Sequence, residues 1–554
     1  MQACVSTQHV GDFVSRSNRG MSNSSPTAAQ DNGRSRAKVE WGAVSNLANT
    51  AIGAGVLSFP FAYSLTGLGF GVLLTISFAI VCSISQSWVA TFQRRTKTES
   101  YEELIGIVFQ SKGVGTLMQV MVFVYQLGAC VAYILVFCDQ ATPLIKYAAQ
   151  EAKANGDDSA FLRFVDQRGT QVFFVSAFLM LPPSMFKDIK ALEKISPIAI
   201  AAVGIMSTIV IWSSVRNISD TSGGIVAIID HDVDVWKTDF YNIAKAIPIL
   251  CFALQSHINV PIIMSSKPNA KPWGIILRAY SIVCALYIPV GFFGYILFRR
   301  LVEAKSGFPG DVLNGFAITN TLADVARVCM MATAVVSYPI NHFPGRSAAF
   351  NLLFPDRSNS TLPLSYFRIH ALMWTASAAL IAYAIPKIEV VFGVMGATVA
   401  SSVMFIIPGF LVLRDKYMQD NGLKIDNDGV INYSQLEGFE DEATNNNVNY
   451  GTMRQSSTSL RGGIGGAGAQ DESDFSSAFS TPSKIEDKSN GNTYSAQSSR
   501  YTVDTRGRDL SFDLGNCHYS SGARGWYMYT WLAVLYIFGG AAIAIVGTVM
   551  SLQG

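Results

Sequence analysis

Long apolar segments, separated by polar ones, run through the chain from residue 42 to residue 413 and return near its C-terminal end. A helix needs about 20 apolar residues to cross the hydrocarbon core of a bilayer. Because lipid offers no hydrogen-bond partners, each segment must satisfy its own backbone, which favours helices. We therefore predict an all-α polytopic membrane protein with eleven spans, near residues 42–65, 68–92, 114–140, 170–186, 193–215, 242–265, 276–299, 319–341, 366–386, 388–413 and 526–551.

Charged residues are scarce and are concentrated between these segments. They make up 14% of the 554 residues, against about 25% in a typical soluble domain. The net charge of +2 is uninformative about a nucleic-acid partner, and the chain has no basic tract long enough to suggest one. Six of the eight cysteines lie inside apolar segments, so we predict neither a structural disulfide nor a zinc site.

The orientation of the spans follows from the basic residues, which are retained in the cytoplasm. Residues 1–40 lack the apolar core of a signal peptide, so we expect the first span to insert without cleavage. A cytoplasmic N-terminus places most basic loop residues inside, and eleven spans then place the C-terminus outside the cytoplasm. The inner basic residues are Arg94, Arg95, Lys97, Lys112, Lys187, Lys190, Lys194, Lys267, Lys271, Arg278, Arg346, Arg357 and Arg368.

Two polar segments, residues 1–38 and residues 416–523, have too few apolar side chains to bury a core, so we expect both to be disordered and cytoplasmic. The second is either a tolerated insertion or a regulatory loop on which kinases and other partners act. Asn217 begins a glycosylation sequon on a predicted outer loop. Asn359 begins another on a predicted inner loop, where we expect no modification.

The first span contains residues that weaken a helix. Gly53 and Gly55 lie in the middle of the segment Asn46–Pro60, beside the polar Asn49 and Thr50. A glycine pair can serve close helix packing. Combined with polar neighbours and a proline, it also suits a helix that unwinds at mid-membrane and offers backbone groups to a ligand.

The sixth span repeats this pattern. The segment Pro248–Pro261 encloses Gln255, Ser256, His257 and Asn259 between two prolines. Polar side chains at membrane depth are functional candidates, although they also form plain helix–helix contacts. Interruptions in corresponding spans of two halves are the best sequence indication of a transporter site.

The segment Asn46–Tyr63 resembles the first helix of the amino acid/auxin permease family. That family includes the sodium-coupled neutral amino acid transporters and the vacuolar amino acid transporters, within the amino acid–polyamine–organocation superfamily. The resemblance covers the membrane region in order, without residues 1–38 or 416–523. Its further matches are Leu127–Tyr133, His257–Pro261, Tyr338–Ile340, Phe343–Pro344, Arg346, Phe392–Thr398 and Pro408–Gly409.

The resemblance implies a 5+5 inverted-repeat fold, with residues 42–215 and 242–413 as the two five-helix repeats and residues 526–551 as an extra helix. It also implies where an amino acid substrate binds. The backbone around the first break would hold the carboxylate, the sixth span would receive the amino group, and Tyr125 or Tyr133 would line the cavity. The substrate-binding residues expected on this basis are Thr50, Ile52, Gly53, Ala54, Gly55, Tyr125, Phe252, Gln255 and Ser256.

The resemblance places a cation site between spans one and eight. It would use Asn49, the carbonyl group of Ile52, Thr333 and Ser337, an oxygen cage that suits a hard cation such as Na⁺. The sodium-coupled branch usually has paired cysteines in its outer loops, and this chain has none there. The coupling ion, Na⁺ or H⁺, therefore stays open, and we expect no other cofactor.

Three ionisable residues in the spans are candidates for coupling or gating. His257 lies in the sixth span, and Asp324 and Arg327 lie three residues apart in span eight. An i,i+3 pair shares a helix face, so these two form either a plain intrahelical ion pair or a gate.

The leading functional hypothesis is a secondary active transporter of small neutral amino acids that works by alternating access. The alternative is an amino-acid sensor of the same fold that signals through its tail or loop. The spans contain no nucleophile–base set or metal spacing of an intramembrane enzyme. They also lack the repeated pore-lining element of a channel. Both the plasma membrane and a vacuolar or lysosomal membrane fit the sequence.

Overall fold

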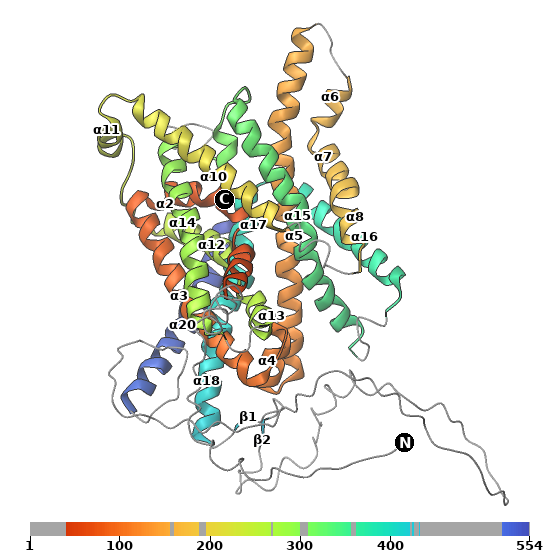
Figure 1. The fold of residues 1–554 in the computed structure, drawn as a ribbon, viewed down its shortest axis with the longest axis vertical. Coiled ribbons are helices and arrows are strands. Elements are labelled where there is room, and N and C mark those ends of the chain that lie inside the picture. Colours follow the sequence, from red (N-terminus) through yellow and green to blue (C-terminus); the bar gives the residue numbers. More distant parts are fainter. Residues whose placement is uncertain are drawn as a thin grey trace, which may run out of the picture.

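The computed structural model describes residues 40–155, 160–187, 196–266, 270–299, 308–355, 362–421, 424–425, 431–432 and 523–552. This part is helical except for the short antiparallel strands β1 (Lys424–Ile425) and β2 (Ile431–Asn432) (Figure 1). The predicted tail at residues 1–38, most of the predicted loop at 416–523 and the sequon at Asn359 lie outside the described residues.

Eight helical stretches of the described residues are long and apolar enough to cross a membrane. The protein is therefore an all-helical polytopic membrane protein, as predicted. These stretches comprise α3 (Leu68–Thr96), α5 (Lys112–Ala154), α10 (Ser196–Ser219), α12 (Phe240–Leu254) with η3 (His257–Asn259) and α13 (Val260–Ser265), α14 (Pro272–Phe298), α15 (Thr321–Leu353), α17 (Ile388–Met395) with η7 (Gly396–Ala400), η8 (Ser402–Ile406) and α18 (Ile407–Asp420), and α20 (Ala523–Leu552).

The remaining three predicted spans are also helical but shorter or interrupted. Residues 40–51 form a helix that stops at Ile52 and continues as η1 (Ala54–Ser58) and α2 (Phe59–Thr66). The fourth predicted span consists of α7 (Arg168–Phe174), the π-helical η2 (Val175–Met180) and α8 (Leu181–Ser184). The ninth is α16 (Leu364–Ala384).

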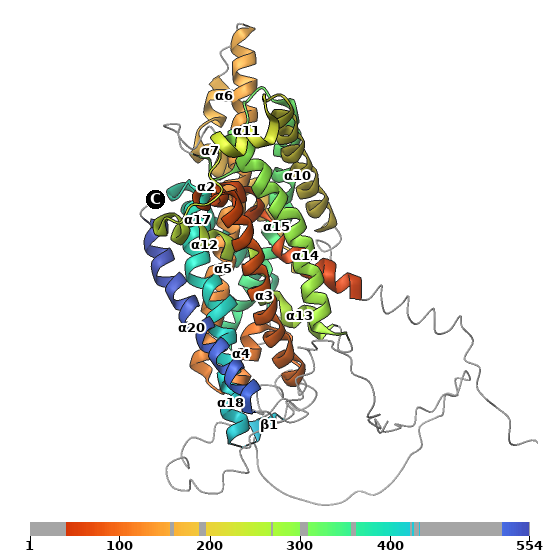
Figure 2. The same ribbon diagram turned by 90° about the vertical axis from the view of Figure 1, so that its left-hand side faces the viewer.

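Short helices at the ends of the bundle are not detected by a search for long apolar segments. They are α4 (Tyr101–Phe109), α6 (Ala160–Val165), α11 (Gly224–His231) and η5 (Val312–Gly315). In Figures 1 and 2, α6, α7 and α11 lie at one end of the bundle, and α4 and α18 lie at the other. We call these the outer and inner ends, following the predicted orientation.

The broken spans lie in the interior of the bundle. Of the window that crosses the membrane in α12–α13, 83% is buried, against 22% for α20. α20 lies along the side of the bundle against α17 and α18, and runs from the inner to the outer end (Figure 2). α5 packs along α15, while α14 packs against α2 and α3. The helices α5, α12 and α14 all contact η1, so they surround the break in the first span.

Candidate substrate-binding site

The first and sixth spans are both interrupted, and the two interruptions face each other. The helix of residues 40–51 ends at Ile52 and Gly53, and η1 begins at Ala54. A Cβ atom added at Gly55 would lie 2.6 Å from the Cβ atom of Ala253 in α12. Only glycine permits so close an approach, so Gly55 lets the two broken spans come into contact.

The sixth span breaks because two residues leave the helical conformation. Gln255 has extended backbone angles, φ −72° and ψ 120°, and Ser256 follows with φ −144°. The chain then resumes as η3 and α13, with Pro261 in the first turn of α13. The break therefore lies inside the segment that the sequence indicated, at its polar residues.

Two tyrosines of α14 hydrogen bond to the broken backbone. The Tyr287 hydroxyl donates to the carbonyl group of Ala51 at 2.7 Å and accepts from the Gly53 N–H at 3.3 Å. The Tyr280 hydroxyl donates to the carbonyl group of Leu254 at 2.9 Å. Residues seven apart lie on one face of a helix, so a single face of α14 hydrogen bonds to the backbone at both breaks. These two residues were not among the predicted site residues, although a tyrosine pair at this spacing within an apolar span was a visible signal.

A polar network behind the second break fixes Ser256 and His257. The amide of Gln86 in α3 donates to the Ser256 hydroxyl at 2.6 Å. The neighbouring Ser85 hydroxyl lies 2.8 Å from Nε2 of His257. Both predicted residues are buried, and neither lines the cavity described next. They therefore hold the break in position from behind.

A cavity of about 40 Å³ lies between the breaks. Its walls come from the first, third, sixth and eighth spans, and its lining includes seven of the nine predicted substrate-binding residues but neither Ile52 nor Ser256. Gln126, Asn259 and Asn341 are amide residues of the lining that were not predicted as ligands. The lining residues are Thr50, Ala51, Gly53, Ala54, Gly55, Tyr125, Gln126, Ala129, Ala132, Tyr133, Phe252, Ala253, Gln255, Asn259 and Asn341.

The two broken ends bring backbone groups of opposite polarity to this cavity. The first N–H groups of a helix and its last carbonyl groups have no partner within the helix. At the start of η1, the described residues contain no hydrogen bond from the Gly55 N–H. At the end of α12, the carbonyl group of Phe252 receives only long hydrogen bonds, from the Gln255 N–H at 3.4 Å and the Tyr125 hydroxyl at 3.5 Å. Helix dipoles add positive character to the first end and negative character to the second.

None of the predicted cation ligands Asn49, Ile52, Thr333 and Ser337 is a lining residue of this cavity, and the two on α15 have different surroundings. The Thr333 hydroxyl is buried and donates to the carbonyl group of Cys329 at 3.0 Å, and it also contacts that of Ala199 in α10 at 3.5 Å. Ser337, one turn further along α15, interacts with the hydroxyl of Tyr133 in the cavity wall. Asn49 is half-buried one turn before Gly53.

The outer side of the cavity is closed by aromatic rings. Phe252 stacks on Phe392 of α17, with ring centroids 4.5 Å apart and 20° between the ring planes. Further out, the Ser58 hydroxyl of η1 donates to the carbonyl group of Gly310 at 2.7 Å. The amide residues Gln126, Asn259 and Asn341 lie on the opposite side of the breaks along their spans. The stack and the hydrogen bond therefore lie on the outer side of the breaks, and the amides lie on the inner side.

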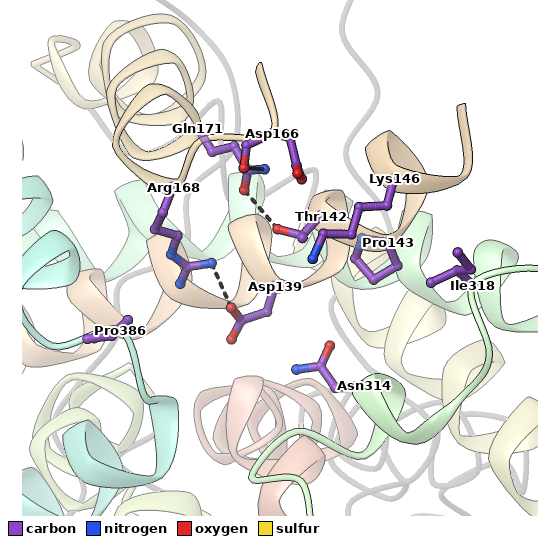
Figure 3. Close-up of a pocket in the computed structure, with 10 residues that line it drawn as sticks. All are labelled: Asp139, Thr142, Pro143, Lys146, Asp166, Arg168, Gln171, Asn314, Ile318 and Pro386. Carbon is purple, nitrogen blue, oxygen red and sulfur yellow. Dashed lines mark hydrogen bonds and ion pairs between the residues drawn. The ribbon is translucent and has the colours of Figure 1, made fainter. Parts of the chain in front are cut away.

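A second, wider cavity of about 500 Å³ lies at the outer end (Figure 3). Arg168 of α7 forms an ion pair with Asp139 of α5 at 2.8 Å, while Lys146 and Asn314 reach the cavity from opposite sides. The arrangement tethers the outer part of α5 to the start of the fourth span.

The predicted pair of Asp324 and Arg327 is formed, with 2.7 Å between Oδ1 and Nη1. Arg327 is fully buried and also donates to the carbonyl group of Phe316 at 3.1 Å. It therefore anchors the outer loop that carries η5. Asn217 accepts a hydrogen bond from Arg299 at 3.0 Å, which ties the predicted sequon to the end of α14.

A helical protein that crosses the membrane many times, with two broken spans around a polar cavity, has the architecture of a membrane transporter. Residues 39–422 match the family model described as transmembrane amino acid transporter protein. The chain belongs to this family, so the predicted family resemblance is confirmed, and the protein is of a transporter class rather than an enzyme class.

Curated relatives agree with this assignment. The chain is 27% identical over 385 residues to the sodium-coupled neutral amino acid transporter 7 of Danio rerio, across 68% of this chain and 78% of that protein. It is also 27% identical over 388 residues to the amino acid transporter AVT6A of Arabidopsis thaliana, across 68% of this chain and 81% of the relative. The solved structure of MhsT in complex with L-phenylalanine has a TM-score of 0.48 and 13% identity, and the match covers 67% of this chain and 88% of that chain.

Proposed function

We propose that this protein is a secondary active transporter of small neutral amino acids, which works by alternating access and is coupled to Na⁺ or H⁺. The observation that supports this most strongly is the pairing of two broken helix ends across one small cavity. An amino acid carries a carboxylate and an ammonium group a few ångströms apart. The Gly55 N–H at the start of η1 suits the carboxylate, and the carbonyl group of Phe252 at the end of α12 suits the ammonium group.

The side-chain lining supports an uncharged substrate side chain. Tyr125, Tyr133 and Phe252 form the aromatic part of the wall, and Gln126 and Asn341 supply neutral amides. The lining contains no charged side chain, and a buried charge without a partner would be costly. A substrate side chain that is small and neutral fits this lining better than an acidic or basic one.

The cavity volume supports alternating access. A buried water molecule needs about 10–15 Å³ of such space, so a cavity of about 40 Å³ is too small for an amino acid. Loading the site therefore requires the walls to move. The Phe252–Phe392 stack is the barrier toward the outer end, and the amide-lined side is where we place the inner path.

The proposed cation site consists of Asn49, the Ile52 carbonyl group, Thr333 and Ser337. Na⁺ prefers oxygen ligands of this kind, whereas H⁺ coupling requires a titratable group. The name of the Danio rerio relative includes sodium coupling, which favours Na⁺ as the first ion to test.

Purified protein in liposomes tests the proposal. Uptake of labelled neutral amino acids would be measured under imposed Na⁺ and pH gradients, with acidic and basic amino acids as comparison substrates. We expect saturable, gradient-driven uptake of small neutral amino acids. Saturable binding without net flux would instead identify a sensor of the same fold. A fluorescent fusion would then distinguish the plasma membrane from a vacuolar or lysosomal membrane.

A further inference from the structure

The transport proposal does not use the carboxyl group of Asp311, at the outer end of the protein. Asp311 immediately precedes η5 and is 1% exposed. Its Oδ2 atom accepts a hydrogen bond from Nε2 of Gln140 in α5 at 2.5 Å. Its Oδ1 atom accepts one from the Leu313 N–H at 2.9 Å. The carboxyl group is therefore held between the outer loop and α5.

The charges that face Asp311 are mostly negative. Asp139 of α5 and Glu389 of α17 oppose its ionisation, and Arg327 of α15 favours it. Arg327 is already paired with Asp324. The other nearby cation, Arg168 of α7, is paired with Asp139 (Figure 3). Among the described residues, Asp311 has no ion pair of its own. Burial, together with Asp139, raises the pKa of Asp311 to about 8.

The partner of Asp311 has an unused acceptor. Gln140 is fully buried, and its Oε1 atom has no hydrogen-bond partner in the described part of the chain. An ionised carboxylate can only accept hydrogen bonds, whereas a protonated carboxyl group also donates one. The two ends of a glutamine amide are assigned from their surroundings. With the amide turned around, a protonated Asp311 donates to Oε1, and the amide nitrogen takes the position that has no partner among the described residues. The contact with Gln140 can therefore hold either form of the carboxyl group.

We propose that Asp311 is a proton-binding site of the outer gate, and that the bound proton stabilises the closed position of residues 308–316 against α5 and the first span. The link to the first span is direct, because Gly310, the residue before Asp311, accepts the hydrogen bond from Ser58 of η1. This site rests on the proposed transport function, which supplies the opening and closing movement. It shares no residue with the proposed cation site.

Proton binding favours the closed state of the gate. When the gate opens, Asp311 meets water and its pKa falls toward the usual value of about 3.9. The closed state therefore binds more protons than the open state, so closing takes one proton up from the solvent at the outer end and opening returns it. Acid favours closure. The ratio of closed to open protein falls as the pH rises from about 4 to about 8, by up to about tenfold per pH unit.

A thiol probe beside the carboxyl group tests this site. Val312 is fully buried in the closed gate, so Val312→Cys reports opening by its reaction with a membrane-impermeant reagent. This reaction rate would be divided by the rate for Asp234→Cys. Asp234 lies at the outer end with a side chain that is 63% exposed, so the ratio removes the effect of pH on thiol ionisation. We expect the ratio to rise at least about tenfold between pH 5.5 and pH 8. With Asp311→Asn added, it should stay at its low, acid value at every pH.

The outcomes separate this site from its neighbours and from the transport proposal. An unchanged pH profile in Asp311→Asn would overturn the proposal. So would a profile that disappears in Glu389→Gln while Asp311 is intact. Amino acid uptake would be measured on the same vesicles. If uptake is absent at every pH while the probe still follows Asp311, the transport function fails and the proton site stands.

A spectroscopic measurement covers the case in which Asp311→Asn does not fold. In wild-type protein labelled with carbon-13 aspartate, the infrared carbonyl band of a protonated carboxyl group should disappear with a midpoint near pH 8. Ordinary aspartates are already ionised at about pH 4, so a transition near pH 8 that persists in Asp139→Asn identifies Asp311 rather than its acidic neighbour. Absence of any such transition above about pH 6 would overturn the proposal.

Discussion

The hydroxyl oxygen of Tyr287 lies 2.7 Å from the carbonyl oxygen of Ala51, the last helical residue before the break in the first span. A tyrosine side chain from α14 thus takes the place of the backbone donor that the interrupted helix lacks. Because an unpaired carbonyl group is costly in a dry interior, this contact explains how the break persists inside a membrane. Tyr280 plays the same part for Leu254 in the sixth span.

Tyr287→Phe should impair transport without unfolding the protein. The variant leaves the Ala51 carbonyl group and the Gly53 N–H without their partner, which costs about 1–3 kcal/mol. We expect the KM for the amino acid to rise roughly tenfold, since the ligand then meets a less well-ordered break. Uptake kinetics in liposomes measure this effect. Tyr383→Phe, at a residue that is 59% exposed, is the control, and equal kinetics for both variants would rule out the assigned role.

Asn49→Ala should weaken cation coupling if Na⁺ is the driving ion. Loss of one neutral oxygen ligand should raise the Na⁺ concentration needed for half-maximal uptake by roughly tenfold or more, an effect of about 1.4 kcal/mol. The maximal rate at saturating Na⁺ should change much less. A sodium titration of uptake measures this. An unchanged titration curve would show that the proposed cation site is misplaced.

Asp324→Asn should destabilise the protein. It leaves the fully buried Arg327 without its counter-charge, and breaking a buried pair costs about 3–5 kcal/mol. Asp234→Asn is the matched control, because Asp234 pairs with Lys237 at the surface and its side chain is 63% exposed. There the cost should stay within about 0–1 kcal/mol. Thermal unfolding in detergent measures both variants, and equal unfolding temperatures would contradict the assigned anchoring role of Arg327.

The span pattern could be predicted from the sequence because membrane crossing is a matter of length and polarity. The ends of the spans were harder to predict from the sequence. The third predicted span stops at residue 140, but α5 continues to Ala154 through Pro143, because a helix that leaves the membrane no longer needs apolar side chains. Likewise, α15 runs through Pro339 and Pro344 without interruption, since a proline alone does not break a well-packed helix.

The site was predicted in part for a physical reason. Gly53, Gly55 and Gln255 lie at the breaks themselves, so local composition reveals them. Tyr287, Gln126 and Asn341 reach the breaks or the cavity only because folding brings distant spans together, and no local pattern records that contact. Asp311 was missed for the same reason. A single carboxyl group in a loop gives no signal in the sequence, because its environment is formed by the distant helices α5 and α17.

In the proposed transporter, the amino acid binds where the first and sixth spans break. Gly55→Val tests it most directly, because any Cβ atom at this position meets Ala253 and the added bulk fills the cavity. Gly204→Val is the matched control, since a Cβ atom there has nothing within 4 Å. The measurement is saturable uptake of a labelled neutral amino acid into proteoliposomes that contain equal amounts of each folded variant. We predict that Gly55→Val shows no uptake above empty vesicles while Gly204→Val remains close to wild type. Wild-type uptake by Gly55→Val would contradict the account.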